Sequence, residues 1–344
     1  MKPRSKEGRT FNISAGERPK VLLLGNGIAR EYYEGANWNK VLEQIRIDGG
    51  FALPSEQYQM PMPLKADMFA KNNLNKFIEL LNVDLPHDKE HDLLSRLLNM
   101  NFDYILTTNY TYEAECAVLN SPEIKISLIN STHYLRENRY FNDNREYSNN
   151  ETEQHRVEID TLQKYENLIS TYNDIENKKI WHIHGEAAYP NTMVLGYSAY
   201  AQLLHTYMKK IEDPENGWLN AFVNGDVYIL GFGMDFAEID LWWLLQHKSE
   251  TWKKRKGKKP DTLYFNPQPY YPDSSAILQY TQGATEWCKI KMLRSCGVKI
   301  KNIRFNNIKK DNSNNNDNSM SYNEFYEFAK NKIEEHIEKR KQEN

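Results

Sequence analysis

Residues 21–27 read VLLLGNG, and this stretch decides the fold. Four consecutive apolar residues that end at a glycine predict a strand buried on both faces, which is typical of a parallel sheet. Similar short apolar runs occur at 104–107, 179–183, 227–230, 262–265 and 298–303. Stretches with helical spacing separate them, so the sequence predicts an α/β fold with a mainly parallel sheet flanked by helices.

The helical spacing predicts the elements that cover this sheet. The expected helices are 38–45, 69–81, 92–100, 113–119, 160–175, 200–211, 218–223, a helix from 239, 275–293 and 322–337, and one more strand is expected at 124–129. We expect a polar arm at 1–19 and then a single domain over 20–344, with helical insertions at about 38–100 and 130–178. Residues 306–319 are almost all Asn, Asp, Ser and Lys, which predicts a flexible loop.

Composition excludes several classes of protein. The chain has 344 residues with 44 Lys and Arg against 47 Asp and Glu, a net charge of −3, so direct binding to nucleic acid or anionic lipid is not expected. The 3 cysteines include no C-x-x-C pair, which excludes a four-cysteine zinc module and argues against a disulfide scaffold. With no apolar run near about 18 residues and no secretory signal visible, we expect a cytoplasmic protein that spans no membrane.

Four of the predicted strands end in residues that are unusual for a strand exit. These ends are Gly25-Asn26-Gly27, Thr107-Thr108-Asn109-Tyr110, His182-Ile183-His184-Gly185 and Gly231-Phe232-Gly233. Ligands of open parallel sheets bind outside the carboxyl ends of the strands, so these four segments should meet at one edge. This convergence is the strongest indication of a binding site in the sequence.

The two glycine segments have two interpretations. Glycines let backbone N–H groups approach a pyrophosphate, but they also make ordinary tight turns. A full dinucleotide fingerprint is absent, because the third glycine would fall at Arg30. The glycines alone therefore do not decide between a nucleotide site and a turn.

Asn109 and the two histidines also have more than one interpretation. Asn109 could hold ribose hydroxyls or a water molecule, or could cap the next helix. His182 and His184 could bind a metal as an H-x-H pair, but no further ligand stands at a familiar spacing. His184 could instead be a general base, and either histidine could be structural.

Taken in order, the motifs resemble the sirtuin-like family, specifically its zinc-less prokaryotic branch of NAD-degrading domains in antiphage defence. The resemblance covers residues about 20–335 and rests on VLLLGNGI at 21–28, ILTTNY at 105–110, WHIHG at 181–185, VYILGFGM at 227–234, KMLRSCGV at 291–298 and the terminal SYNEFYEF.

The resemblance implies a Rossmann-like sheet that binds NAD as its substrate. Asn109 would orient the ribose hydroxyls and an attacking water, and His184 would act as general base. The residues implied to line the dinucleotide are Gly25, Asn26, Gly27, Thr108, Tyr110, Gly231, Phe232 and Gly233. No metal is implied.

Departures from the family decide which reaction to expect. The cysteines cannot build the zinc module of protein-deacylating sirtuins, and Ala29 to Tyr33 replace the proline-aspartate-phenylalanine-arginine segment that follows their first glycine loop. Thr111 stands where the family often has Asp. We therefore expect an NAD+ glycohydrolase that depletes NAD after oligomerisation or after binding a partner such as a ring ATPase. An ADP-ribosyl or deacylase-type transferase, and a silent NAD-binding assembly partner, are the alternatives.

Overall fold

The computed structural model describes residues 18–28, 38–50, 60–70, 73–81, 92–119, 158–159, 171–175, 178–187, 192–211, 217–270, 276–306 and 322–342. Its strands are β1 Lys20–Leu24, β2 Tyr104–Thr107, β3 Glu158–Ile159, β4 Thr171–Ile175, β5 Lys178–His182, β6 Asp226–Leu230, β7 Thr262–Tyr270 and β8 Lys299–Asn306. Its helices are α2 Trp38–Asp48, α3 Met62–Phe69, α4 Leu74–Leu81, α5 Asp92–Leu98, α6 Glu113–Leu119, α8 Gly196–Lys210, α9 Gly217–Asn224, α10 Ile239–Lys254, α11 Ala276–Ser295 and α12 Tyr322–Gln342.

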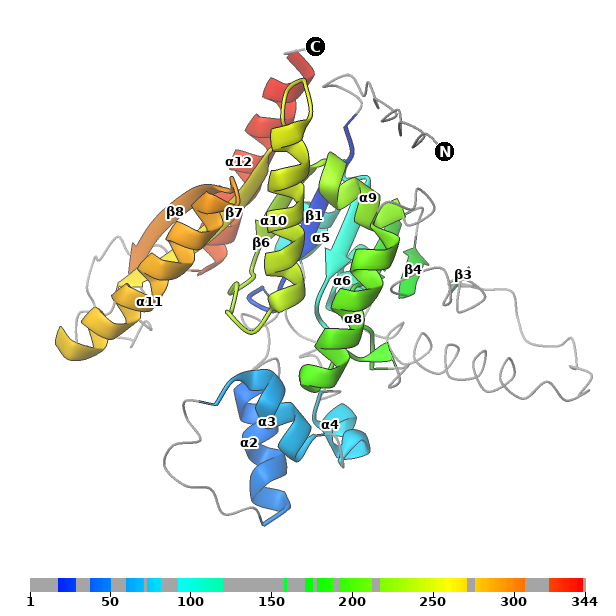
Figure 1. Cartoon of the computed structure of the whole chain (residues 1–344), viewed down its shortest axis with the longest axis vertical. Helices are drawn as coiled ribbons and strands as arrows, with labels where there is room; N and C mark the ends of the chain where they lie inside the picture. Colours follow the sequence, from blue (N-terminus) through cyan, green and yellow to red (C-terminus); the bar gives the residue numbers. More distant parts are fainter. Residues whose placement is uncertain are drawn as a thin grey trace, which may run out of the picture.

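All eight strands belong to one sheet, in the order β3-β4-β5-β2-β1-β6-β7-β8 (Figure 1). The six strands from β5 to β8 in this order are parallel, and counted along the chain they run 3-2-1-4-5-6, which is a Rossmann-like arrangement. β4 pairs antiparallel with β5, and β3 pairs antiparallel with β4. The predicted α/β fold with a mainly parallel sheet is confirmed. The strand order reverses at β1, so the carboxyl end of β1 is the switch point where ligands of such sheets bind.

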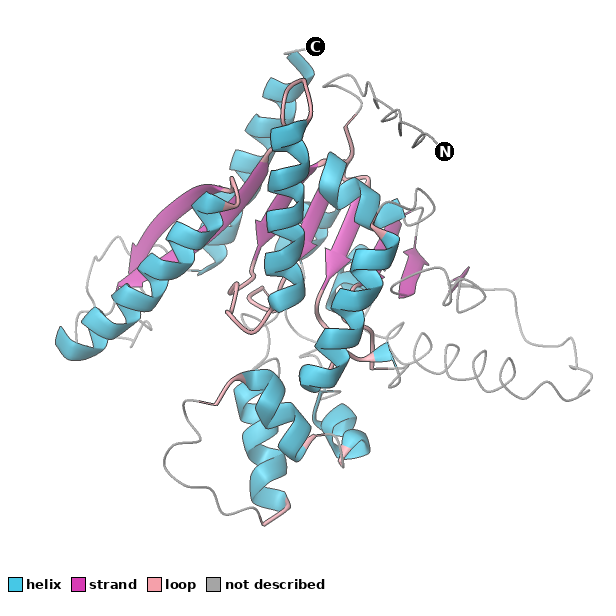
Figure 2. Cartoon of the chain, viewed as in Figure 1, coloured by secondary structure: helices cyan, strands magenta, loops and turns pink. Residues whose placement is uncertain are grey.

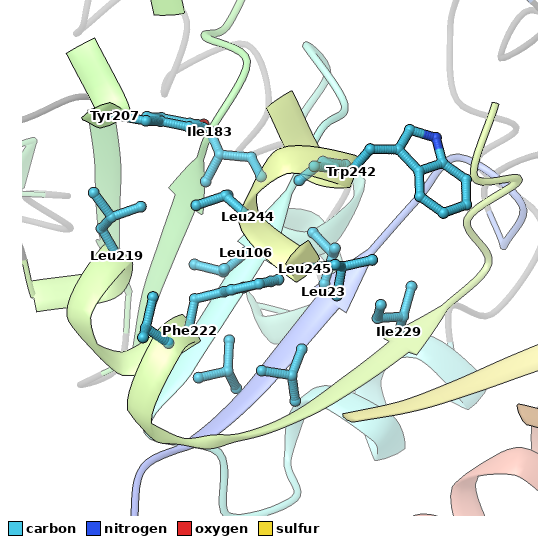
Figure 3. Packing of buried hydrophobic residues seen from close by; sticks show 14 of the residues in the cluster. Leu23, Leu106, Ile183, Tyr207, Leu219, Phe222, Ile229, Trp242, Leu244 and Leu245 are labelled. Carbon is cyan, nitrogen blue, oxygen red and sulfur yellow. The ribbon is translucent and has the colours of Figure 1, made fainter. Parts of the chain in front are cut away.

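Two layers of helices cover the sheet, one on each face (Figure 2). Alternate residues of β1 face opposite sides: Leu22 and Leu24 pack with α5, α6 and α12, whereas Val21 and Leu23 pack with α8, α9, α10 and α11. This two-residue period buries both faces, which is why the strand is a continuous apolar run. Figure 3 shows the second layer, where Leu106 lies next to Phe222 and Leu23 lies next to Leu245.

A third cluster of apolar side chains joins α2, α3 and α4, which lie beyond the carboxyl ends of the strands (Figure 1). The ring centroids of Trp38 and Tyr110 are 5.0 Å apart, and those of Trp38 and Phe77 are 5.5 Å apart. Tyr110 directly follows β2, so this aromatic contact ties the small helical group to the edge of the sheet where a ligand is expected.

Some local predictions differ from the structure. The predicted helix over 69–81 is two helices, α3 and α4, and residues 171–175 form the strand β4 instead of the end of a helix. The helical insertion predicted at about 130–178 likewise contains the strands β3 and β4. The helical spacing misled because β4 takes its conformation from antiparallel pairing with β5, which is a tertiary contact. The predicted strand at 124–129 lies outside the described residues, as do nearly all of the predicted arm at 1–19 and the loop at 306–319.

Candidate functional site

A pocket of about 500 Å³ lies at the carboxyl ends of β1, β2, β5 and β6. Eight of the ten residues that the sequence assigns to the site line this pocket: Asn26, Gly27, Thr108, Asn109, His184, Gly231, Phe232 and Gly233. Other lining residues come from α2, α3, α8, α11 and α12 and include Trp38, Met62, Tyr200, Lys289 and Tyr326. The four strand ends therefore converge, as the parallel sheet predicts.

The two glycine loops contact each other through their backbones. The N–H of Gly25 donates to the Leu230 carbonyl at 3.0 Å, and the N–H of Gly27 donates to the Gly231 carbonyl at 2.7 Å. A Cβ at Gly25 or Gly27 would lie 2.5 or 2.7 Å from the Gly231 oxygen, which is too close for any larger residue. These two N–H groups serve the fold and do not face a phosphate, so the glycines act by permitting close packing beside the pocket.

Asn109 follows β2 and is positioned by its backbone. Its N–H donates to Thr107 Oγ1 at 3.1 Å, and its carbonyl accepts a hydrogen bond of 2.8 Å from His182 Nδ1. The next helix, α6, begins only at Glu113, so Asn109 is too far upstream to cap it. With the capping interpretation removed, Asn109 is a pocket residue.

His182 is a buried support for Asn109 and does not line the pocket. Its Nε2 lies 2.7 Å from Glu115 Oε1, while Nδ1 contacts the Asn109 carbonyl. Burial lowers the pKa of His182, but the charge and hydrogen bond of Glu115, the charge of Glu186 and the Asn109 carbonyl outweigh it and raise the pKa to about 9. Both ring nitrogens meet acceptors, so both donate and the ring is an imidazolium ion. His182 and His184 therefore do not form an H-x-H metal pair.

His184 lines the pocket and is held by two carboxylates from the segment after β6. Its Nε2 donates to Asp240 Oδ2 at 2.9 Å, and its Nδ1 lies 3.9 Å from Glu238 Oε2. Burial lowers the pKa of His184, but the charge and hydrogen bond of Asp240 and the charge of Glu238 outweigh it, so the pKa is raised. The site thus contains a carboxylate–histidine pair that the sequence analysis did not identify.

Glu238 is the other residue that the sequence analysis missed. It lines the pocket, and its Oε2 accepts a hydrogen bond of 2.9 Å from the Tyr200 hydroxyl. Burial raises the pKa of Glu238 to about 7, assisted by the nearby Asp240 and opposed by His184. The available signal was the run of acidic residues Asp235, Glu238 and Asp240 directly after a predicted strand end.

Among the described residues, His184, Glu238 and Asp240 also form a group of metal-ligand types, since one ligand atom from each lies within 4.8 Å of the others. However, His184 Nε2 and Asp240 Oδ2 are at hydrogen-bond distance, and an ion between them would require that bond to open. The geometry is that of a hydrogen-bonded acid–base cluster.

Gly25 and Tyr110 lie behind the wall of the pocket. Gly25 is buried against Phe232, and Tyr110 is buried among α2, α3 and α4 with its hydroxyl donating to the Val194 carbonyl at 2.9 Å. Tyr110, which the resemblance assigns to the dinucleotide site, thus packs behind residues that line the pocket.

The end of the pocket formed by β7 and α11 is polar. Asn266, Glu286 and Lys289 line it, and Lys289 Nζ lies 2.5 Å from Glu286 Oε2 and 3.2 Å from the carbonyl of Gly233. A cation beside a glycine loop is suited to a phosphate group, and an amide with a carboxylate can accept the hydrogen bonds of ribose hydroxyls.

Among the described residues, no helix is long and apolar enough to cross a membrane. Comparison with known protein families found no family whose sequence pattern matches this chain, and comparison with curated proteins found no significant relative.

Proposed function

We propose that the chain is a sirtuin-like NAD+ glycohydrolase that releases nicotinamide and ADP-ribose. The observation that carries this proposal is the meeting of Asn109 and His184, 75 positions apart in sequence, in one pocket at the switch point of a Rossmann-like sheet. A neutral amide and a histidine in such a pocket suit a ribose whose hydroxyls must be held while its glycosidic bond breaks.

The chemistry of NAD+ explains why so few groups are needed. Cleavage of the bond between nicotinamide and C1′ develops positive charge on the ribose, as in other glycoside hydrolyses. The leaving nicotinamide becomes neutral when it takes the bonding electrons, so it needs no acid. Asn109 would hold the ribose and a water molecule, and His184 would take the proton from that water.

The rest of the pocket can accommodate the remainder of NAD+. Lys289 would neutralise a pyrophosphate oxygen near the second glycine loop, and Asn266 with Glu286 would meet the adenosine ribose. Trp38 and Met62 from the helical group would cover the nicotinamide end and exclude bulk water.

The test is chromatography of the products formed from NAD+ by the purified chain. Hydrolysis predicts equimolar nicotinamide and free ADP-ribose, with both lost in Asn109→Ala and His184→Ala. His205→Ala, an exposed position on α8, is the matched control. Nicotinamide without free ADP-ribose, with label transferred to a protein or nucleic acid, would instead identify a transferase. Tight NAD+ binding without turnover would identify a binding module.

We further propose that the NADase belongs to an antiphage defence system and is restrained until it assembles. An enzyme that depletes NAD is toxic to its own cell, so its activity should depend on oligomerisation or on a partner such as a ring ATPase. Size exclusion coupled to light scattering should show an oligomer. If it shows a monomer, that monomer should be inactive until its partner is added. A strict monomer with full activity at all concentrations would contradict this.

A further inference from the structure

Glu238 has a position that helix capping does not explain. It is the N-cap residue of α10, and its side chain makes no hydrogen bond to a backbone N–H of that helix. The side chain turns instead toward Tyr200 and His184 and lines the pocket. A carboxylate that lines the pocket beside a histidine is placed to take part in proton transfer.

The orientation of His184 is consistent with this. Asp240 is fully buried and accepts a hydrogen bond from Nε2–H of His184, which fixes the ring and its tautomer. The nitrogen that remains, Nδ1, lies on the side of Glu238 at 3.9 Å. Whatever proton Nδ1 accepts during a reaction therefore arrives next to the Glu238 carboxylate.

We propose that Glu238 is a further catalytic residue, which accepts, together with His184 Nδ1, the proton of the water that attacks the ribose. The inference rests on the proposed NAD+ hydrolysis and adds a carboxylate to the expected pair Asn109 and His184. Asp240 is then a positioning residue, since it acts through His184.

The step balances as follows. The water oxygen forms a bond to C1′, the C1′–nitrogen bond breaks, and its electron pair neutralises the pyridinium ring of nicotinamide. One proton of the water passes to the His184–Glu238 pair and later to solvent. The sum is NAD+ and water giving nicotinamide, ADP-ribose and one proton, with no oxidant or reductant.

The charged and titratable groups that face Glu238 are His184 after β5, Tyr110 after β2, Tyr200 and Tyr207 from α8, Asp235 from the loop after β6 and Asp240 from α10. Burial raises the pKa of Glu238 to about 7, and the two carboxylates Asp235 and Asp240 act in the same direction, while His184 and the Tyr200 hydrogen bond oppose the shift. A carboxyl group in this range can both accept and release a proton near neutral pH.

The experiment compares steady-state NAD+ hydrolysis by wild type, Glu238→Gln and Glu250→Gln. The glutamine at 238 keeps the size of the side chain and can still accept the Tyr200 hydrogen bond, so a purely structural role would be preserved. Glu250 is an exposed residue on the same helix and gives the matched control. We expect Glu238→Gln to lower kcat by about 10²- to 10⁴-fold and to flatten the pH profile near neutrality, while KM changes little.

The outcomes separate the two claims. If wild type hydrolyses NAD+ and Glu238→Gln remains within about threefold of it with the same pH profile, the role of Glu238 is overturned and the proposed function stands. If wild type does not cleave NAD+ even with its assembly partners, the proposed function falls and the inference with it. Loss of wild-type activity in EDTA that Mg²⁺ or Mn²⁺ restores would also overturn the proton-accepting role, because the cluster would then bind a metal.

Discussion

At the scale of single residues, burial lowers the pKa of both histidines of the site, but neighbouring carboxylates outweigh burial and raise that pKa. His184 is held by Asp240 on one nitrogen and faces Glu238 with the other. His182 is held between Glu115 and the carbonyl of Asn109. The two histidines of one short motif thus have different tasks: one supports the backbone of the site, and the other faces the pocket.

Asp240→Asn should impair catalysis without unfolding the protein. Loss of the carboxylate charge removes the main influence that raises the pKa of His184, and an amide can hold the ring in the wrong tautomer. We expect kcat to fall roughly 10- to 10³-fold, with the apparent pKa of kcat shifted downward. Steady-state rates across pH, with thermal unfolding as the control for folding, measure this. An unchanged pH profile would contradict the role of Asp240.

The His182–Glu115 pair should make stability depend on pH. The folded pKa of about 9 exceeds the ordinary 6.5, so its contribution is fully present below pH 6.5 and is lost as pH rises through 9. The shift corresponds to about 3 kcal/mol. Burial also lowers the pKa of Lys248 to about 7, so Lys248 titrates in the same pH range. The contribution of the pair is therefore obtained by comparing wild type with a variant of Glu115, in which Lys248 is unchanged.

Urea unfolding of wild type and Glu115→Gln at pH 6.5 and pH 9 tests this pair. The glutamine removes the charge that raises the pKa of His182. We expect the difference in unfolding free energy between the two proteins to be larger at the lower pH. An equal difference at both values would show that the ring is not held as an imidazolium ion.

At the scale of elements, the buried strands and the segments that follow them could be predicted from the sequence. β1, β2, β5 and β6 are apolar runs that are followed by glycine or polar residues. A parallel sheet must bring the carboxyl ends of such strands to one edge. Asn109 and His184 were found for this reason.

The parts that were missed depend on contacts between distant segments. Glu238 and Asp240 resemble ordinary acidic residues at the start of a helix, and only the fold places them against His184. β4 is a strand only because β5 pairs with it, and Tyr110 is turned away from the pocket by Trp38 and Phe77. The acidic run at 235–240 marks a candidate segment in the sequence, but no local pattern shows which residues it contacts.

The turn after β5 depends on Gly185, and its replacement should displace His184. Gly185 has φ +81°, and a Cβ there would lie 2.1 Å from the carbonyl oxygen of Thr192. Gly50 has φ +67° but open space around it, so Gly50→Ala reports the backbone strain alone. We expect Gly185→Ala to lower the unfolding free energy by about 1–3 kcal/mol more than Gly50→Ala does. Equal losses in thermal unfolding would contradict the close approach.

At the scale of the whole molecule, α12 forms ion pairs with the amino ends of β6 and β7, at the end of the sheet opposite the pocket. Arg340 near its end lies 3.3 Å from Asp226 and 3.0 Å from Asp261, at the amino ends of β6 and β7. Burial raises the pKa of Asp261, but hydrogen bonds from His336 and Lys299 and the charges of Arg340 and Lys299 outweigh it and hold that pKa well below its ordinary value. This charged group lies at the amino ends of the strands, whereas the candidate pocket lies at their carboxyl ends.

Arg340→Met should destabilise the fold without changing the chemistry of the pocket. It leaves the buried Asp226 carboxylate without this cation, which costs about 3 kcal/mol. Lys341→Met, which breaks an exposed pair with Glu338, should cost under about 1 kcal/mol and is the matched control. Urea unfolding measures both. Similar losses in the two variants would contradict the fastening role of Arg340.

The central claim is that this sheet edge cleaves the nicotinamide–ribose bond of NAD+. The most direct measurement is the initial rate of nicotinamide release by wild type and by Asn109→Ala, at equal concentration and with the assembly partners present. We expect sustained nicotinamide release by wild type and an initial rate at least about 100-fold lower in the variant. No release by wild type, or equal release by both proteins, would contradict it.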